Sequence, residues 1–414
     1  MAAGINSRGF AAYLGTLFGG AFNDNVFKLL LLCYASNLLG KDSAATKLYV
    51  PLAGALFVVP FLLFSSYAGY LADRFSKRSV MIGTKVAEVL IMLAGVFFFA
   101  RHSVYWLLAI LFVMGAQSAF FSPAKYGFMP ETLPESQLSR GNGATQLFTF
   151  LAIILGSWAG GALAAWSGKN PHYAAWFCVA IAIAGLVMSF GITPTRPGNP
   201  TVRLQIDPFT PHLRTLLEMR RDRLLWLCLL ANTFFWFLAA LFQLTLLFLA
   251  KGTLGGDDSL VGYLQAAVAL GIGAGCALAG LLSRDRIEYG MIIPGGLMTG
   301  LFCCLLGVFG ANLAGAYICS AAMGFSAGFF QLPLVTAIQK RSPQRCRGRY
   351  LGAGNALDCI SMMLASLVQW LLLKVLAFDA RGVFVCAGLL TIAVVIYIAR
   401  KAPTLWQRSL RLGR

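Results

Sequence analysis

The sequence predicts an all-α integral membrane protein with twelve transmembrane helices in two six-helix pseudo-repeat lobes. Three observations lead to this fold class. The chain of 414 residues is 58% hydrophobic and only 12% charged, with a mean hydropathy of +0.75, and a soluble chain could not hide that much apolar surface. Twelve apolar runs are long enough to cross a bilayer, which takes roughly 20 residues. A polar linker separates six runs from the other six, as in chains built from two repeated halves.

Each predicted span is an apolar run bounded by charges or turn residues. The runs cover residues 10–39, 48–71, 79–100, 104–129, 140–166 and 173–193, then 224–250, 259–283, 289–310, 312–338, 350–377 and 382–399. Residues 194–223 hold five prolines, six arginines and no run of spanning length. We therefore expect an N-terminal lobe over 1–193 and a cytoplasmic linker, helical in part, over 194–223. A C-terminal lobe over 224–414 ends in a basic cytoplasmic tail. Two such lobes are the layout of a secondary transporter.

Lysine and arginine residues in the connections set the orientation. One side of the membrane carries 23 of them and the other carries seven, and the richer side faces the cytoplasm. This bias predicts a multi-pass protein with both termini and the linker in the cytoplasm. A net charge of +18 would suggest nucleic acid for a soluble protein. Here the basic residues lie in short loops, so the expected partner is the anionic lipid of the cytoplasmic leaflet, and not nucleic acid.

The first span contains an unusual polar group, Asn23-Asp24-Asn25 followed by Lys28. At about 1.5 Å per residue, Asp24 lies roughly 20 Å from either end of the run, near the bilayer midplane. Charges at that depth are costly unless they face a polar cavity or one another. Asp24 and Lys28 share a helix face, so they could form a self-neutralising pair that fixes this helix to its neighbours. The alternative, which we favour, is a binding site for a ligand that is both charged and polar.

Further polar residues inside the spans are candidate ligand contacts. Glu88 follows Lys85 by three residues, so these two could equally neutralise each other. Lys125 follows a helix-breaking proline and could instead snorkel to the interface. Asn355 and Asp358, one helical turn apart, are the strongly polar cluster of the second half. The full candidate set outside the first span is Glu88, Gln117, Lys125, Trp236, Gln331, Asn355 and Asp358.

The loop after the second span combines one acid with several bases. It runs from Gly69 to Arg78 and resembles the G-x-x-x-D-R-x-x-R/K-R/K loop of the major facilitator superfamily, in the same place along the chain. Acid and bases so close could clamp neighbouring helix ends in one conformation and release them in another. A basic loop that only sets topology is the alternative. The candidate gate residues are Gly69, Asp73, Arg74, Lys77 and Arg78, with Glu288 in the matching loop after span eight.

Four motifs together resemble the lysophospholipid transporter family of the major facilitator superfamily. They are Ala21-Phe22-Asn23-Asp24-Asn25-x-x-Lys28, Ser122-Pro123-Ala124-Lys125-Tyr126-Gly127, the loop that ends at Gly290, and Gly352-Ala353-Gly354-Asn355-Ala356. The resemblance implies the fold of that superfamily and transport by alternating access. The implied substrates are lysophospholipids, chiefly lysophosphatidylethanolamine, which move from the outer to the inner leaflet of the bacterial inner membrane. An acyltransferase there restores the missing chain, and in some bacteria it is fused to the transporter domain, so a cytoplasmic acyltransferase is a possible partner.

The headgroup chemistry fits the residues of the first half. Asp24 suits the ammonium of lysophosphatidylethanolamine, Lys28 or Lys125 suits its phosphate, and the flanking amides suit its hydroxyl and phosphate oxygens. One departure from the family concerns the other half of the site. Some members carry an arginine inside span seven, whereas residues 224–250 have none and offer Asn232, Trp236 and Gln243.

Three rival functions follow from other features. An enzyme is suggested by the G-x-S-x-G match at Gly324 to Gly328, but the match lies inside an apolar run and not at a strand-to-helix elbow. A proton-coupled exporter of drugs or metabolites would use Asp24 or Glu88 as proton carrier. A membrane anchor for a partner acyltransferase is suggested only by the basic tail. The cysteines form no CxxC pair and lie mostly in apolar runs, so we expect neither a metal site nor a cofactor.

Overall fold

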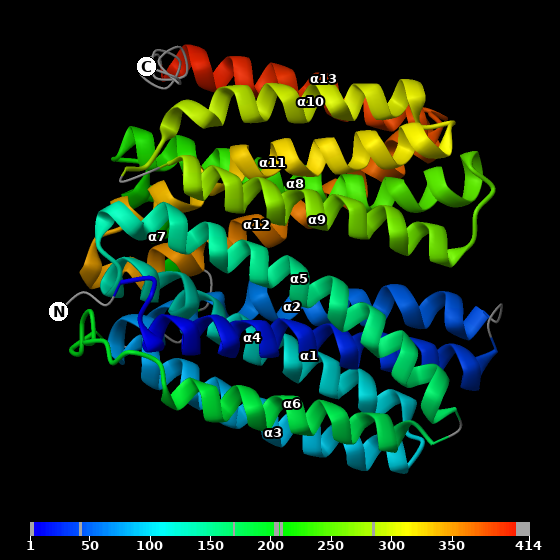
Figure 1. Ribbon diagram of the computed structural model, residues 1–414, viewed down its shortest axis with the longest axis horizontal. Helices are drawn as coiled ribbons and strands as arrows, with labels where there is room; N and C mark the ends of the chain where they lie inside the picture. Colours follow the sequence, from blue (N-terminus) through cyan, green and yellow to red (C-terminus); the bar gives the residue numbers. More distant parts are fainter. Residues whose placement is uncertain are drawn as a thin grey trace. The chain divides into compact units, whose positions relative to one another are not determined.

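The computed structural model describes residues 4–40, 44–168, 170–202, 207, 210–283 and 286–402. Arg284 and the predicted basic tail from residue 403 onward lie outside the described residues. Helices and the turns that connect them make up the described chain (Figure 1). The predicted all-α fold class is therefore confirmed.

Packing divides the chain into two compact units. The first unit consists of Met1–Pro134, Leu151–Leu217 and Ser342–Ala356, and the second consists of Glu135–Phe150, Glu218–Arg341 and Leu357–Arg414. Two long helices, α5 (Glu135–Ser167) and α12 (Arg347–Trp370), therefore contribute one part to each unit. The predicted lobes over 1–193 and 224–414 follow the sequence repeat and stay a prediction.

The first unit is built around α4. Its helices are α1 (Arg8–Leu39), α2 (Ala44–Arg74), α3 (Lys77–Ala100), α4 (Val104–Thr132) and α6 (Pro171–Phe190), with the second half of α5. Helix α4 packs against α2 and α3, and α6 packs against α1 and α3. Phe27, Leu30, Phe99, Leu107 and Met114 are fully buried at their centre. This apolar core holds the polar turn of α1 in place.

The second unit is built around α11. It contains α8 (Arg223–Phe248), α9 (Asp258–Leu282), α10 (Ile292–Phe309), α11 (Leu313–Arg341) and α13 (Ala380–Lys401). Helix α11 packs against α8, α9 and α10, and α10 packs against α13. π-helical turns at Leu249–Thr253 and Leu371–Val375 follow α8 and α12. In the linker, the short helix α7 (Thr210–Met219) confirms the expectation of partial helix.

Twelve long helices of the described chain correspond to the twelve predicted spans. Eleven of them are long and apolar enough to cross a membrane. The remaining one is α1, whose 32 residues are ample at 1.5 Å per residue but whose central Asn23, Asp24, Asn25 and Lys28 lower its hydropathy. The same residues that mark the candidate site thus account for the lower hydropathy of the central part of α1.

Side-chain caps mark several helix starts. The Ser76 hydroxyl accepts a hydrogen bond from Ser79 N at the start of α3. The Asp222 carboxylate accepts from Leu224 N and Leu225 N at the start of α8. Asp379 accepts from Gly382 N at the start of α13. Each cap supplies an acceptor for amide groups that have no partner within the helix.

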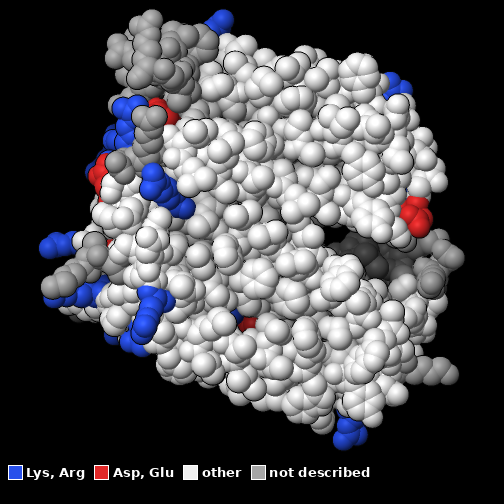
Figure 2. Space-filling model, in the orientation of Figure 1, with Lys and Arg blue, Asp and Glu red and all other residues white. Residues whose placement is uncertain are grey.

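The surface between the helix ends is apolar. Figure 2 shows white side chains along the helices and most Lys and Arg side chains near helix ends. Leu90, Trp158 and Val187 are examples of large apolar side chains that are more than half exposed. Apolar exposure on this scale requires hydrocarbon as the surrounding solvent, so the protein is a multi-pass membrane protein.

Glycines bring α1 and α5 into close contact in the first unit. A Cβ at Gly156 would lie 2.5 Å from the carbonyl oxygen of Phe22, and one at Gly160 would lie 2.8 Å from that of Val26. Both distances are too short for any side chain, so the small residues permit the approach of the two backbones. At Gly161, by contrast, a Cβ would meet only the Leu29 side chain, at 3.6 Å.

We predict that Gly156→Leu destabilises the protein and Gly161→Leu does not. The larger side chain at 156 must push α1 away from α5, and overpacking of this kind costs about 1–3 kcal/mol. Thermal denaturation of the purified protein in detergent measures the difference. Equal melting temperatures for the two variants would contradict the close packing of α1 on α5.

Candidate functional site

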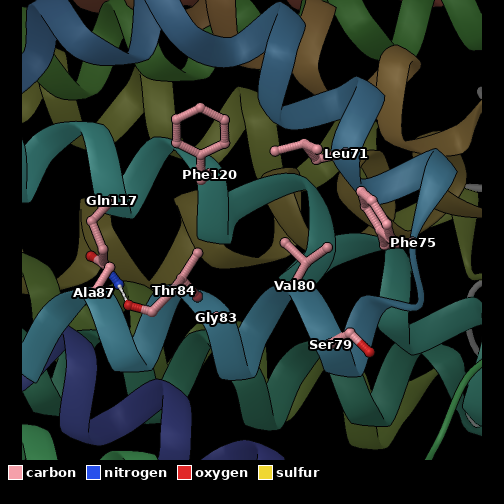
Figure 3. Close-up of a pocket in the computed structure, with 9 residues that line it drawn as sticks. All are labelled: Leu71, Phe75, Ser79, Val80, Gly83, Thr84, Ala87, Gln117 and Phe120. Carbon is pink, nitrogen blue, oxygen red and sulfur yellow. Dashed lines mark hydrogen bonds between the residues drawn. The ribbon is translucent and has the colours of Figure 1, made fainter. Parts of the chain in front are cut away.

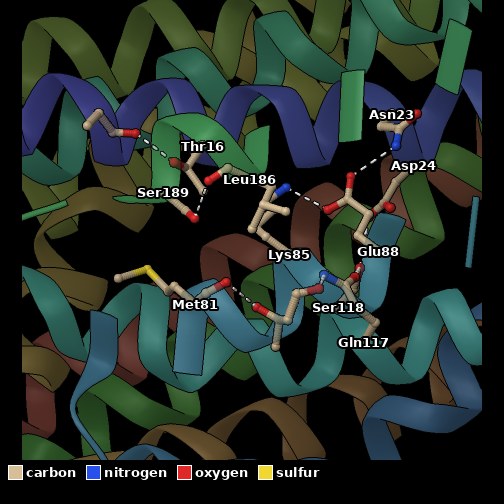
Figure 4. A network of polar contacts seen from close by, with 12 residues as sticks. Thr16, Asn23, Asp24, Met81, Lys85, Glu88, Gln117, Ser118, Leu186 and Ser189 are labelled. Atoms are coloured by element: carbon tan, nitrogen blue, oxygen red, sulfur yellow. Dashed lines mark hydrogen bonds and ion pairs between the residues drawn. The ribbon is translucent and has the colours of Figure 1, made fainter. Parts of the chain in front are cut away.

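The polar turn of α1 lies against α3 and α4 in the first unit. Asn23 is fully buried, and its Nδ2 donates a hydrogen bond to Glu88 Oε1 at 2.9 Å. The other Glu88 oxygen contacts Lys85 Nζ at 2.6 Å, and these two side chains are 1% and 2% exposed. Figure 4 shows this chain of contacts between α1 and α3. The predicted local pair of Lys85 and Glu88 therefore forms, and Asn23 joins it.

Glycines on two other helices make room for the Lys85 ammonium. A Cβ at Gly20 of α1 would lie 2.6 Å from Lys85 Nζ, and a Cβ at Gly185 of α6 would lie 3.4 Å from it. The ammonium is thus enclosed by α1, α3 and α6 and held by Glu88. This enclosure favours a structural role for the pair. It argues against Glu88 as a mobile proton carrier, because its two oxygens are already engaged by Lys85 and Asn23.

Asp24 has one oxygen satisfied and one oxygen free. Ser118 of α4 donates from its hydroxyl to Asp24 Oδ2 at 2.8 Å. The buried Oδ1 atoms of Asp24 and of the adjacent Asn23 have no hydrogen-bond partner among the described residues. Buried acceptors without donors are costly. A ligand that brings donors, above all a cationic one, would satisfy both atoms.

Lys28 does not pair with Asp24 in this structure. Its ammonium lies over the ring of Phe57 of α2, 5.5 Å from the centroid, and in the described part of the chain no ion pair joins it to Asp24. A cation–π contact leaves the ammonium hydrogen-bond donors available. The self-neutralising pair that the spacing allows is therefore replaced by an acid and a base with separate partners.

The other predicted residues of the first unit already have contacts within the protein. The amide of Asn25 donates to Ala21 O of its own helix at 2.7 Å, so it does not reach out to a ligand. Gln117 is buried and donates from Nε2 to Thr84 O at 3.0 Å. Lys125 Nζ lies 4.9 Å from the ring centroid of Tyr126. Of the predicted bases, Lys28 lies on the same helix as Asp24, one turn away.

A second polar cluster lies in the second unit around Asp358 of α12. Asn232 Nδ2 donates to one carboxylate oxygen at 3.0 Å, and Thr233 Oγ1 donates to the other at 2.9 Å. Asp358 is 9% exposed, and no ion pair reaches it among the described residues. Trp236, one turn further along α8, is half-buried against the ring of Phe235.

Asn355 and Asp358, expected as one cluster, have partners in different units. Asn355 donates to Ser122 Oγ of α4 at 2.8 Å, within the first unit. Gln331 of α11 accepts from Gln146 Nε2 of α5 at 3.0 Å, within the second. Sequence reasoning missed the partners Ser118, Thr233 and Gln146, because a lone hydroxyl or amide in an apolar run carries no distinctive pattern.

The predicted gate residue Asp73 binds the first turn of α12. Its Oδ1 accepts from Gly348 N at 2.6 Å and its Oδ2 from Arg349 N at 3.0 Å. A carboxylate at a helix N-terminus combines charge-assisted hydrogen bonds with a favourable helix dipole. Gly69, one turn earlier on α2, makes room, because a Cβ there would lie 2.5 Å from Gly348 O.

The bases of the same loop have other partners than Asp73 in the described chain. Lys77 Nζ contacts Glu131 Oε1 of α4 at 2.8 Å, with both side chains buried. Arg74 donates to the hydroxyl of Tyr70, and Arg78 donates to Phe190 O. The acid of the loop thus binds a neighbouring helix end, and the gating role of the loop stays a prediction. The acid binds a backbone, and Lys77 uses an acid from another helix.

Within the described part of the chain, Glu288 in the matching loop makes only local contacts. Its carboxylate accepts from Arg286 Nε at 3.0 Å and from Gly290 N at 3.3 Å. It therefore caps the turn that leads into α10. The loop after span eight has the place of the first loop along the chain, but its contact with a distant helix is a hydrogen bond from Ser139 Oγ of α5 to Arg286 O, at 3.4 Å, and does not involve the acid.

Comparisons with known proteins identify the family. The Major Facilitator Superfamily profile matches residues 13–366. The lysophospholipid transporter LplT of Cronobacter sakazakii is 31% identical over 366 residues, which cover 85% of this chain and 84% of that protein. This chain belongs to the lysophospholipid transporter family of the major facilitator superfamily. LplT of Pectobacterium carotovorum is 30% identical, and the match covers 85% of this chain and 82% of that protein. LplT of Escherichia coli is 28% identical to this chain.

Solved transporters of the superfamily share the fold. The human organic anion transporter MFSD10 superposes with a TM-score of 0.77 at 17% identity, over 94% of this chain and 99% of its own. The fucose:proton symporter FucP of Escherichia coli gives 0.75 at 16% identity, over 94% and 97%. The predicted major facilitator fold is thereby confirmed.

We predict that Asp73→Asn slows transport while substrate affinity stays nearly unchanged. The neutral amide can accept from only one of the two backbone donors, and a hydrogen bond to a charged group is worth about 1.5–3 kcal/mol. Initial transport rates and equilibrium binding, measured on the same preparation, separate the two effects. Glu288→Gln is the matched control, because that acid makes only local contacts. Equal loss of binding and transport in Asp73→Asn would contradict a gating role.

We also predict that Glu88→Gln is less stable than the double variant Lys85→Met, Glu88→Gln. Removing one partner of a buried ion pair costs about 3–5 kcal/mol, whereas removing both charges can be nearly neutral. Folded yield and melting temperature in detergent provide the comparison. A double variant as unstable as the single one would show that the pair does not act as a self-contained structural unit.

Proposed function

We propose that the protein transports lysophospholipids, chiefly lysophosphatidylethanolamine, from the outer to the inner leaflet of a bacterial inner membrane. Relatives named lysophospholipid transporters, 28–31% identical over 85% of the chain, support the substrate class. The observation that carries the proposal is the arrangement on α1. Asp24 offers a free carboxylate oxygen, and Lys28, one turn away, offers an ammonium with no carboxylate partner of its own among the described residues.

A zwitterionic headgroup uses both of these groups. Its ammonium binds Asp24 Oδ1 and Asn23 Oδ1, the two buried acceptors that lack donors. Its phosphodiester binds Lys28, with Lys125 as the second base on α4. Asn25 and Gln117 hold their amide hydrogens in bonds to backbone carbonyls, so they contribute less than the motif suggests.

The polar cluster of the second unit contains an acid, and no base contacts that acid among the described residues. Asp358 is held by the neutral donors of Asn232 and Thr233, and its charge disfavours phosphate. We therefore propose that the cluster of Asp358 and Trp236 favours an ammonium or hydroxyl group over a phosphate. Asn355 and Gln331, which bind Ser122 and Gln146, are assigned to helix contacts that change during the transport cycle.

The cellular setting of the proposal follows from the charge bias of the loops. Both termini and the linker face the cytoplasm, and the lobes over 1–193 and 224–414 alternate access about the linker. Lysophospholipid delivered to the inner leaflet is a substrate for re-acylation, so a cytoplasmic acyltransferase is the proposed partner. We assign no catalytic role to the G-x-S-x-G match, because Ser326 lies inside α11 and its hydroxyl donates to Ala322 O.

Asp24→Asn should lower the affinity for lysophosphatidylethanolamine about 10- to 100-fold. The change keeps the shape but removes a charge-assisted hydrogen bond worth about 1.5–3 kcal/mol, at 1.4 kcal/mol per factor of ten. Lysophosphatidylglycerol, which has no amine, should lose much less. Equilibrium binding of both lysolipids to the wild type and to the variant measures the ratio of the two affinities, which tests the prediction. An unchanged ratio would contradict ammonium recognition by Asp24.

Lys28→Met serves as the complementary variant for this measurement. Both lysolipids carry a phosphodiester, so their affinities should fall together and the ratio should stay near the wild-type value. Loss of only one of the two lysolipids in Lys28→Met would contradict phosphate recognition by this residue.

A further inference from the structure

An apolar groove of about 470 Å³ runs along the first turns of α3, between α2 and α4 of the first unit. Its walls include Leu71 of α2, Phe75 directly after α2, Val80, Gly83 and Ala87 of α3, and Phe120 of α4. Figure 3 shows Phe75 at one end and Gln117 at the other. The volume falls in the range of about 300–1,000 Å³ that is typical of ligand sites.

The polar groups inside the groove are already satisfied by the protein. Thr84 Oγ1 donates to Met81 O at 2.8 Å, and Gln117 Nε2 donates to Thr84 O at 3.0 Å. Ser79, at the Phe75 end, has an exposed hydroxyl that contacts the Ser76 hydroxyl at 2.7 Å. Between Val80 and Ala87 the groove therefore offers mainly hydrocarbon. From Ser79 to Ala87 it extends about 12 Å at 1.5 Å per residue. This length and this apolar lining suit the part of one extended acyl chain that is nearest to the headgroup.

The end of the groove near Phe75 is cationic. The exposed guanidinium of Arg74 lies 5.7 Å from the centroid of the Phe75 ring. The N-terminus of α3, capped by Ser76, lies at the same end and adds a positive dipole. The nearby acids are buried in other contacts, Asp73 with the first turn of α12 and Glu131 with Lys77. The rim thus attracts a negative group, and the nearby acids of the described chain are not available to an ammonium.

We propose that this groove binds an anionic diacyl phospholipid of the cytoplasmic leaflet. Its phosphate lies at Arg74 and the start of α3, and one acyl chain lies along Val80, Gly83 and Ala87. The charge of the rim distinguishes this site from the headgroup site on α1. The rim offers a cation, whereas α1 offers both an acid and a base. A lipid with a net negative headgroup, such as phosphatidylglycerol, is therefore preferred here over zwitterionic phosphatidylethanolamine. The site is independent of the lysophospholipid proposal.

Gly83 provides the test variant. A Cβ at this position meets no atom within 4 Å, so Gly83→Leu fills the groove without a clash. Gly54, elsewhere on α2, also meets nothing within 4 Å and gives the matched control Gly54→Leu. Arg74→Gln removes the rim charge and leaves the apolar walls intact. Melting temperatures confirm that all three variants are folded.

The measurement uses the full-length purified protein with phosphatidylglycerol or phosphatidylethanolamine that carries a photoreactive diazirine on one acyl chain. Labelled peptides are mapped by mass spectrometry. We expect labelling of the α3 and α4 groove peptides by phosphatidylglycerol, reduced about tenfold in Gly83→Leu and unchanged in Gly54→Leu. Arg74→Gln should abolish the preference for phosphatidylglycerol while chain labelling persists. Groove labelling that is equal in Gly83→Leu and Gly54→Leu, or a preference unaffected by Arg74→Gln, would overturn the proposal.

Discussion

Burying Lys85 and Glu88 between α1, α3 and α6 costs several kcal/mol per ion, and their 2.6 Å contact offsets that cost only if the remaining polar atoms are also satisfied. Asn23 supplies the missing donor to Glu88, and the absence of side chains at Gly20 and Gly185 leaves space for the ammonium. This arrangement fixes the rotation of α1. Once Asn23 points to α3, Asp24 must lie beside α4, where Ser118 donates to it.

The buried charges therefore have two different roles, one structural and one in the proposed binding site. Lys85 and Glu88 neutralise each other and hold the helices together. Asp24 and Lys28 share a helix face without neutralising each other, so each keeps part of its hydrogen-bonding capacity. A membrane protein retains such unsatisfied charge at a cost in stability. Binding a zwitterion would offset that cost, and this is the physical basis of the proposed headgroup site.

The two polar helix contacts near the ends of α5 and α12 differ in character. Asp73 binds the first turn of α12 through a charge, within the first unit. Asn142 of α5 and Gln339 of α11 exchange two neutral hydrogen bonds, at 2.7 and 3.0 Å, within the second. A charged contact at a helix start is stronger and more sensitive to substitution than an amide pair. Gating variants are therefore expected to act mainly through Asp73.

Hydropathy and loop composition predict the spans closely, since each apolar run has a helix within a few residues of its expected limits. The Lys85–Glu88 pair was also predictable, because both partners lie on one helix. The partners of Asp24, Asp73 and Asp358 were not. Spacing along one helix shows which residues share a face but not which helix that face meets. The donors to Asp73 are the backbone amides of Gly348 and Arg349, 275 and 276 positions away, which no local pattern in the sequence could indicate.

Headgroup-resolved lysolipid transport by the purified protein in proteoliposomes is the most direct measurement. The wild-type protein is expected to move lysophosphatidylethanolamine between leaflets and to be competed by other lysophospholipids, while a cationic dye typical of drug exporters is not moved. Transport of the dye without any movement of lysophosphatidylethanolamine would contradict the proposed substrate.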